Sequence, residues 1–291
     1  MPMSTSRAVL EISGPLSTHW VGNGFPVRTL LSPQVQGQDI SPFLLLDYAG
    51  PREFAPTGER RGVEEHPHRG FETVTIVYQG ELEHRDSAGH HGRIGPGDVQ
   101  WMTAGSGVVH EELHERDFAR RGGAFEVVQL WVNLPAAHKL TPPRYQELAA
   151  ARIPVVTLPG GATVRVIAGD CGGTGGLAHT VTPLNVWDVR VAAGRRAELE
   201  IPAGHNAVVA LLRGVVAFDG QERLTGPQTV LLGRDGDRVV LEAASDAGLL
   251  LLTGEPLAEP IASYGPFVMN TEAEIRQALE DYRAGRMGHL A

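Results

Sequence analysis

One succession of turns and strand-like runs occurs twice along this chain of 291 residues. In each copy a turn containing glycine and proline precedes an apolar run, and further apolar runs lead to a closing proline. The corresponding segments are 95–101 and 226–232, 107–112 and 238–243, and 127–131 and 249–252. A repeat of this kind indicates two copies of one structural unit. We therefore predict two similar domains, residues 1–140 and 141–291, with Pro142 and Pro143 close to the boundary.

Short strands dominate the predicted secondary structure. The chain contains 36 glycines and 20 prolines, which separate many short runs rich in Val, Leu and Ile. Frequent turns between short strands are typical of all-β sandwiches and barrels. The exception is one helix predicted at about residues 271–285, where Thr271 and Glu274 match a capping box and Gly285 can end the helix. Its apolar residues recur with helical spacing and predict a docking face, formed by Ile275, Ala278, Leu279 and Tyr282.

Charge and composition exclude several classes of function. The formal net charge is −9, so the chain lacks the overall basic character of proteins that bind nucleic acid directly. No apolar run is long enough for a membrane span, and residues 1–7 do not resemble a signal peptide. The single cysteine, Cys171, cannot form an intramolecular disulfide and is expected to be an idle, buried thiol. These features favour a cytoplasmic protein, and closed barrels make a monomer the default expectation.

Two pairs of polar residues stand out as candidate metal ligands. On a β-strand, residues two apart point to the same face, so His66 and His68 project together, as do His110 and Glu112. If the two strands face one another inside a barrel, three imidazoles and one carboxylate converge. That donor set suits a first-row transition metal with open coordination positions, and Fe(II) is the leading candidate.

Other polar residues near these pairs receive different interpretations. His84, His90 and His91 are expected to be solvated, the last two in a turn-like segment. Glu111 should point away from the ligands and be solvated or ion-paired. Glu72 is an alternative ligand, because it follows His68 by four residues, although a bulge at the intervening glycine would change its face.

The second copy of the repeat lacks these residues. Leu241 stands where the first copy has His110, and Ala243 stands where it has Glu112. His205 precedes an apolar strand and is followed two residues later by Ala207. We therefore expect a packed second barrel without metal.

These residues resemble the pirin family of the cupin superfamily along nearly the whole chain. The blocks that carry the resemblance are FLLLD at 43–47, HPHRGFETV at 66–74, PGD at 96–98, QWMTAG at 100–105, QLWVNLP at 129–135 and GPFVMNT at 265–271. The resemblance implies two tandem cupin (jelly-roll) β-barrels, with a metal, typically iron, in the N-terminal barrel only. The general cupin pattern has a glutamate where this chain has Thr73. As in pirins, the carboxylate ligand would instead come from the His-x-Glu segment.

The residues that match the pirin metal centre are His66, His68, His110 and Glu112, which disfavours Glu72 as a ligand. The resemblance implies one of two activities. The first is that of a quercetin 2,3-dioxygenase, in which O2 opens the central ring of a flavonol with release of carbon monoxide and Glu112 accepts the substrate proton. The second is non-enzymatic regulation, in which an iron-bearing protein binds a transcription factor or a metabolic enzyme as a protein partner. An isomerase or small-molecule binder of another cupin type is a third alternative, which Thr73 disfavours.

Overall fold

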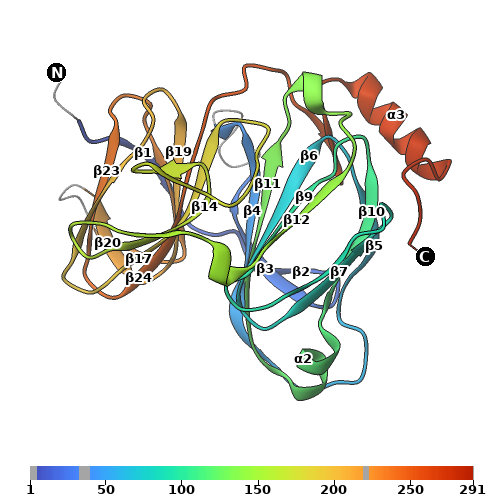
Figure 1. Ribbon diagram of the computed structural model, residues 1–291, viewed down its shortest axis with the longest axis horizontal. Coiled ribbons are helices and arrows are strands. Elements are labelled where there is room, and N and C mark those ends of the chain that lie inside the picture. The colour runs from blue at the N-terminus through green and yellow to red at the C-terminus, as the bar shows by residue number, and fades with distance from the viewer. Residues whose placement is uncertain (1–4, 33–39, 219–222, 291) are drawn as a thin grey trace. The chain divides into compact units, whose positions relative to one another are not determined.

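Strands make up most of the computed structural model, which describes residues 5–32, 40–218 and 223–290 (Figure 1). The strands pair in antiparallel fashion into two large sheets, two four-stranded sheets and two small hairpin sheets. This is the all-β fold expected from the composition. Among the described residues, no helix has the length and apolar character needed to cross a membrane.

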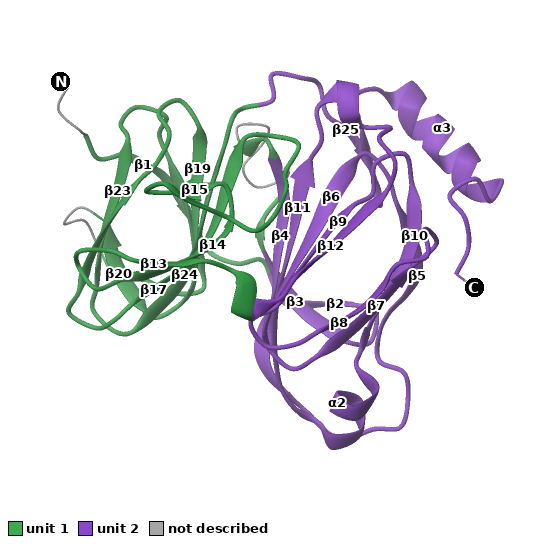
Figure 2. Ribbon diagram, viewed as in Figure 1, with its two compact units in different colours: residues 1–16, 30–42, 151–256 green, residues 17–29, 43–150, 257–291 purple. Residues whose placement is uncertain are grey.

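The chain forms two compact units, each built from discontinuous segments (Figure 2). One unit, here called the histidine barrel, contains residues 17–29, 43–150 and 257–291. The other, the apolar barrel, contains residues 1–16, 30–42 and 151–256. This division differs from the predicted domains 1–140 and 141–291 at both ends of the chain. The reason is strand pairing over long sequence distances, because the first strand, β1 (Val9–Ser13), pairs with β22 (Gln228–Leu232).

The histidine barrel consists of a seven-stranded and a four-stranded sheet. The larger sheet has the order β12 (Arg144–Leu148), β9 (Val99–Thr103), β6 (Phe71–Gln79), β11 (Gly123–Asn133), β4 (Phe43–Phe54), β3 (Phe25–Leu31) and β2 (His19–Val21). The smaller sheet has the order β5 (Gly62–His68), β10 (Val108–His114), β7 (Leu82–Asp86) and β8 (His91–Ile94).

The apolar barrel repeats this plan. Its larger sheet has the order β1, β22, β19 (Asn206–Arg213), β24 (Ala247–Gly254), β17 (Leu184–Val191), β14 (Thr163–Ala168) and β13 (Val155–Thr157). Its smaller sheet has the order β18 (Arg196–Glu200), β23 (Arg238–Ala243), β20 (Val215–Phe218) and β21 (Arg223–Thr225), and a hairpin pairs β15 (Asp170–Cys171) with β16 (Thr174–Gly175). Taken position by position, the strand orders of the two barrels correspond, which confirms the predicted repeat.

Short helices complete the described structure. The predicted C-terminal helix is α3 (Glu272–Arg283), and Thr271 and Glu274 form the expected capping box. Gly285 has a φ of +71° just beyond the helix, a conformation that glycine adopts without strain. The sequence did not reveal α2 (Arg116–Arg121), because six residues are too few to show helical periodicity. Two 3₁₀ turns lie at η2 (Ala136–His138) and η3 (Ala150–Arg152).

The C-terminal segment packs on the histidine barrel. The hairpin of β25 (Ala262–Tyr264) and β26 (Phe267–Met269) leads into α3. Ile275 and Ala278 of the helix are buried in one apolar cluster with Val109 of β10 and Phe267 of β26. The predicted docking face is therefore real for these two residues, whereas Tyr282 remains 38% exposed.

Candidate metal centre

Three imidazoles converge on one face of the smaller sheet in the histidine barrel. Strands β5 and β10 are hydrogen-bonded neighbours, with His66 opposite His110 and His68 opposite Val108. The ring of His110 lies 4.3 Å from the ring of His66 and 4.9 Å from that of His68, centroid to centroid. The expectation that the two strands face one another was wrong, because they lie side by side. The same-face argument for the histidines holds nevertheless.

The structure contains two overlapping groups of metal-ligating side chains. One group is His66, His68 and His110, and the other is His84, His110 and Glu112. Within each group, one ligand atom from every residue lies within 4.8 Å of the others. Glu112 thus lies close to His110, as the sequence predicts, and it shares a cavity with His66 and His68.

A bulge in the pairing of β5 with β10 falls between the positions of His110 and Glu112. Along β5 the register shifts between His110, which is opposite His66, and Glu112, which is opposite Val63. The pairing of β10 with β7 on its other side stays regular, with Asp86 opposite His110 and His84 opposite Glu112. The bulge therefore adjusts β5 relative to β10 without disturbing the strand that carries His84.

Hydrogen bonds of the ring nitrogens fix which atoms face the centre. Nδ1 of His66 lies 2.8 Å from the carbonyl oxygen of Glu64, and Nδ1 of His68 lies 3.3 Å from that of Pro266. Because a carbonyl oxygen only accepts, both Nδ1 atoms donate and both Nε2 atoms keep a lone pair. Nε2 of His110 is buried and has no hydrogen-bond partner among the described residues. A lone pair directed at a metal would account for this atom, so the donor set fits a divalent first-row ion.

The same environment keeps these imidazoles neutral. Burial holds the pKa of His68 well below its usual value, and the nearby His66 ring lowers it further. Burial also holds the pKa of His110 well below the ordinary value, with further lowering from the surrounding histidines. Neutral imidazole is the form that binds metals.

Glu112 is held by polar side chains of the larger sheet. The hydroxyl of Thr75 donates to Oε1 of Glu112 at 2.9 Å, and the amide of Gln100 donates to the same atom at 3.2 Å. Register pairing places Gln100, Thr75, Gln129 and Asp47 directly opposite one another on β9, β6, β11 and β4. A polar row therefore crosses the larger sheet and supports the carboxylate from beneath.

A cavity of about 330 Å³ opens beside the imidazoles. Its lining is mainly apolar and consists of Val21, Phe25, Val27, Leu45, Asp47, Val63, His66, His68, Glu112, Gln129, Trp131 and Pro266. Asp47 is the only acidic side chain in this lining besides Glu112. Burial raises its pKa, and the hydroxyl of Thr29 donates to Oδ1 of Asp47 at 2.6 Å. Apart from the proposed ligands, sequence reasoning named none of the residues that wall this cavity, because the lining comes from six separate stretches of the chain.

The remaining candidates have other positions. Glu72 lies on β6 three residues from Thr75 and therefore on the opposite face, where Thr103 donates to it at 2.6 Å. Glu111 points away from the centre, as predicted, and forms ion pairs with Arg60 and Arg85. His91 is exposed, as expected.

One of the histidines expected to be solvated is not. His84 is 2% exposed and belongs to the second ligand group. The expectation was wrong because alternation along β7 puts His84 on the inner face, next to β10. His90 is partly buried, and its Nδ1 lies 3.0 Å from Oδ2 of Asp86.

The apolar barrel carries apolar side chains at the matching positions. We match Leu241 and Ala243 to His110 and Glu112 as the sequence repeat does, since β23 has in its sheet the place that β10 has in the other. The counterparts of His66 and His68 on β18 are then Ala197 and Leu199. His205 is not a counterpart, since it precedes β19, the strand equivalent to β6.

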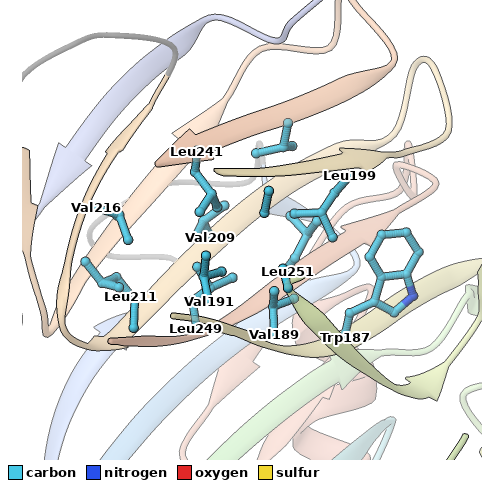
Figure 3. Close-up of a cluster of buried hydrophobic side chains, with 14 of the residues drawn as sticks. Trp187, Val189, Val191, Leu199, Val209, Leu211, Val216, Leu241, Leu249 and Leu251 are labelled. Carbon is cyan, nitrogen blue, oxygen red and sulfur yellow. The ribbon is translucent and has the colours of Figure 1, made fainter. Parts of the chain in front are cut away.

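All four matching residues belong to one buried apolar cluster. The polar row is replaced in the same way, with Trp187, Leu251, Val209 and Val230 in place of Asp47, Gln129, Thr75 and Gln100. Figure 3 shows these side chains filling the interior, with Leu199 and Leu241 from the smaller sheet pointing toward Val209 and Leu251 from the larger one. The shared fold therefore does not require the polar interior of the histidine barrel.

Comparisons with known proteins agree with this architecture. A family model described as Pirin matches residues 24–132, and a model described as Pirin C-terminal cupin domain matches residues 186–288. A Pseudomonas aeruginosa protein named "Putative quercetin 2,3-dioxygenase" is 58% identical and covers 96% of this chain and 98% of its own length. Human pirin is 38% identical over 90% of this chain and 87% of its own. A crystal structure of quercetin 2,3-dioxygenase from Acinetobacter baumannii is 50% identical, has a TM-score of 0.95 and covers 99% of this chain and 100% of its own.

Proposed function

The chain belongs to the pirin family, and from that premise we propose that it is a cytoplasmic, metal-dependent quercetin 2,3-dioxygenase. In this proposal His66, His68, His110 and Glu112 hold one divalent ion, Fe(II). The substrates are a flavonol and O2, and the central ring of the flavonol is opened with release of carbon monoxide. The observation that carries the proposal is the buried Nε2 of His110, which has no hydrogen-bond partner among the described residues and belongs to one group of ligand atoms with His66 and His68. Those two imidazoles line the mainly apolar cavity.

The ion would supply Lewis acidity that lowers the pKa of the flavonol 3-hydroxyl. Glu112 is the residue placed to accept the proton that this hydroxyl releases, because its carboxylate lines the same cavity as His66 and His68. The hydrogen bonds from Thr75 and Gln100 both go to Oε1. They anchor the carboxylate through Oε1 and leave Oε2 to bind the ion and to accept the proton of the substrate.

The cavity supports a flat aromatic substrate. Val27, Leu45 and Trp131 provide apolar surface, and a volume of about 330 Å³ is in the range of small-molecule sites. Asp47 adds one hydrogen-bond acceptor to these walls. A planar ring system that carries hydroxyl groups would match this combination of apolar walls and isolated acceptors.

Turnover of quercetin by the iron-loaded protein tests the proposal. In air, the flavonol absorbance should disappear, and carbon monoxide should form in equal amount. His110→Ala should abolish both signals because it removes the buried Nε2 ligand. His205→Ala is the matched control, since it alters a histidine of the apolar barrel, and it should keep wild-type turnover.

Two results would contradict the proposal. Quercetin that binds without being consumed by protein with a full equivalent of iron would exclude the dioxygenase while preserving the metal centre. Failure of the wild-type protein to retain iron, cobalt, nickel or zinc after reconstitution would exclude the metal centre itself.

A further inference from the structure

A buried chain of polar side chains leads from His110 to two residues of the neighbouring strand β7. Nδ1 of His110 lies 3.4 Å from Nδ1 of His84, and Nε2 of His84 lies 3.3 Å from Oδ2 of Asp86. The side chains of His84 and Asp86 are 0% and 1% exposed. Because solvent is not an alternative partner for these buried groups, their hydrogen bonds must be satisfied within the protein, and Oδ2 of Asp86 also lies 3.0 Å from Nδ1 of His90.

We propose that Asp86 and His84 are positioning residues that hold His110 in the tautomer required for metal binding. The proposal rests on the metal centre proposed above, but it does not depend on the reaction catalysed there. A neutral imidazole has one N–H and one nitrogen lone pair. If one ring nitrogen accepts a hydrogen bond, the other must carry the proton, so the partner of one ring determines which nitrogen of the next ring is protonated. The carboxylate of Asp86 only accepts, and it therefore determines which nitrogen carries the proton in His84 and, through His84, in His110.

The assignment follows ring by ring. Asp86 accepts from Nε2–H of His84, which leaves the lone pair of His84 on Nδ1. That lone pair accepts from Nδ1–H of His110, which leaves the lone pair of His110 on Nε2. Nε2 is the buried atom without a partner. The proton positions set at Asp86 thus place a lone pair where a metal ligand is needed.

Neighbouring groups hold the first two members of the chain in place. Oδ1 of Asp86 accepts the backbone N–H groups of Ala88 at 2.9 Å and His90 at 3.0 Å, so this oxygen is committed to the turn after β7. The ring of Tyr145 stacks on His84, with centroids 4.9 Å apart and planes at 22°. These contacts orient Oδ2 toward His84 and fix the plane of the His84 ring.

The apolar barrel shows that the fold does not require this arrangement. With Leu241 matched to His110 as in the sequence repeat, strand pairing puts Phe218 in the place of Asp86 and Val216 in the place of His84. All three are buried in the apolar cluster. Since an apolar trio packs the same place in the second copy, the buried polar trio of the histidine barrel calls for a functional explanation.

Asp86→Asn tests the direction of the chain. The amide oxygen can keep the two backbone hydrogen bonds, which turns the amide NH2 toward His84. His84 must then present a lone pair at Nε2 and a proton at Nδ1, and His110 must protonate Nε2. Competition of the protein with a chelator for Zn²⁺ should show affinity about 10- to 100-fold weaker than wild type. Nitrogen chemical shifts of the metal-free protein should place the His110 proton on Nε2 instead of Nδ1.

His84→Phe provides a second variant, and His90→Ala provides the control. Phenylalanine retains the stacking on Tyr145 but offers no acceptor to His110, so zinc affinity should fall by a similar factor. His90→Ala removes the other histidine that contacts Asp86 and should leave zinc affinity unchanged. Thermal unfolding of each metal-free variant separates loss of the metal ligand from loss of the fold.

Several outcomes would overturn the inference. It fails if folded Asp86→Asn and His84→Phe both bind zinc as tightly as wild type. It also fails if electron–nuclear spectroscopy of the Cu²⁺-loaded protein shows one imidazole fewer in His84→Phe, because His84 would then be a ligand itself. If Asp86→Asn and His84→Phe bind zinc more weakly than wild type while the wild type does not turn over quercetin, the proposed reaction is overturned and this inference stands.

Discussion

Two glutamates of the histidine barrel have different environments. Glu112 lines the cavity beside the imidazoles, whereas Glu72 lies on the other face of β6 and is 1% exposed. Burial raises the pKa of Glu72 to about 7, although the hydrogen bond from Thr103 opposes the shift. A carboxyl group with this pKa is protonated in the folded protein at pH values where it is ionised in the unfolded chain.

Glu72→Gln should therefore stabilise the protein in a pH-dependent way. The folded pKa of about 7 exceeds the unfolded value of 4.5, so the wild type loses stability as pH rises between these values. Between about pH 4 and about pH 8, the unfolding free energy of the wild type should fall by about 3 kcal/mol relative to that of Glu72→Gln. Urea unfolding at both pH values measures it. Glu111→Gln is the control with the opposite sign, because pairing with Arg85 and Arg60 lowers the pKa of Glu111. A pH-independent difference for Glu72→Gln would contradict this account.

Asp47 should recognise a substrate hydroxyl other than the one at position 3. Asp47→Ala is expected to raise KM for quercetin about tenfold, through loss of a hydrogen bond to a charged acceptor, with little change in kcat. The comparison substrate is 3-hydroxyflavone, which carries only the reacting hydroxyl, and its KM should not change. Equal effects on the two substrates would show that Asp47 shapes the cavity without contacting a hydroxyl.

For single residues, the sequence predicts which side chains of one strand share a face, because this depends on that strand alone. Alternation along β5 is enough to place His66 and His68 on one face, and alternation along β10 places His110 and Glu112. The role of His84 depends on which strand lies next to β10, and no local pattern contains that information. Its inward position was therefore missed.

Among the elements, the C-terminal hairpin and α3 have the strongest connection to the metal centre. The carbonyl of Pro266, just before β26, accepts the hydrogen bond from Nδ1 of His68. Arg69 pairs with Asp281 of α3 at 2.7 Å, and both side chains are largely buried. The capping box allowed α3 to be predicted. The barrel on which it docks could not be predicted, because an apolar stripe does not identify its partner.

Lys139→Met should loosen this segment. Lys139 is the only lysine in the sequence and is 1% exposed, and its Nζ donates to Gly70 O, Val268 O and Asn133 Oδ1 at 2.7–2.9 Å. Methionine keeps the apolar stem but leaves three acceptors unpaired, so unfolding free energy should fall by about 3 kcal/mol. Zinc affinity should fall as well, since Val268 of β26 lies two residues from Pro266 in the same hairpin. His138→Ala, at an exposed neighbour, is the control for both measurements. If Lys139→Met is destabilised but keeps wild-type zinc affinity, the position of the hairpin does not affect metal binding.

Across the whole molecule, one strand plan supports two different interiors. The histidine barrel has a row of polar residues where the apolar barrel has Trp187, Leu251, Val209 and Val230. Stability in the second barrel therefore comes from packing, which large-to-small substitutions measure directly.

Leu251→Ala should lower the free energy of unfolding by about 2–5 kcal/mol, because Leu251 is 0% exposed and its removal leaves a cavity. Zinc affinity should stay at the wild-type value, since every proposed ligand belongs to the other unit. Leu10→Ala, at a residue 65% exposed on β1, is the control and should change stability little. A loss of zinc affinity in Leu251→Ala would show that the two cores are coupled.

The repeat and the all-β class were predictable because they depend on patterns within each copy. The membership of the two units was not. Strand β1 belongs to the apolar barrel through its pairing with β22, and residues 257–291 belong to the histidine barrel. Both assignments depend on contacts between segments that are more than 180 residues apart, for which a single sequence offers no signal.

The hydrogen bond between His68 and Pro266 also bears on biosynthesis. The two residues are 198 positions apart, so a ribosome completes β5 and β10 long before it adds the carbonyl that orients His68. A nascent chain therefore exposes its imidazoles without their final partner. The full set of contacts around His68 therefore exists only after the last hairpin has packed on the first barrel.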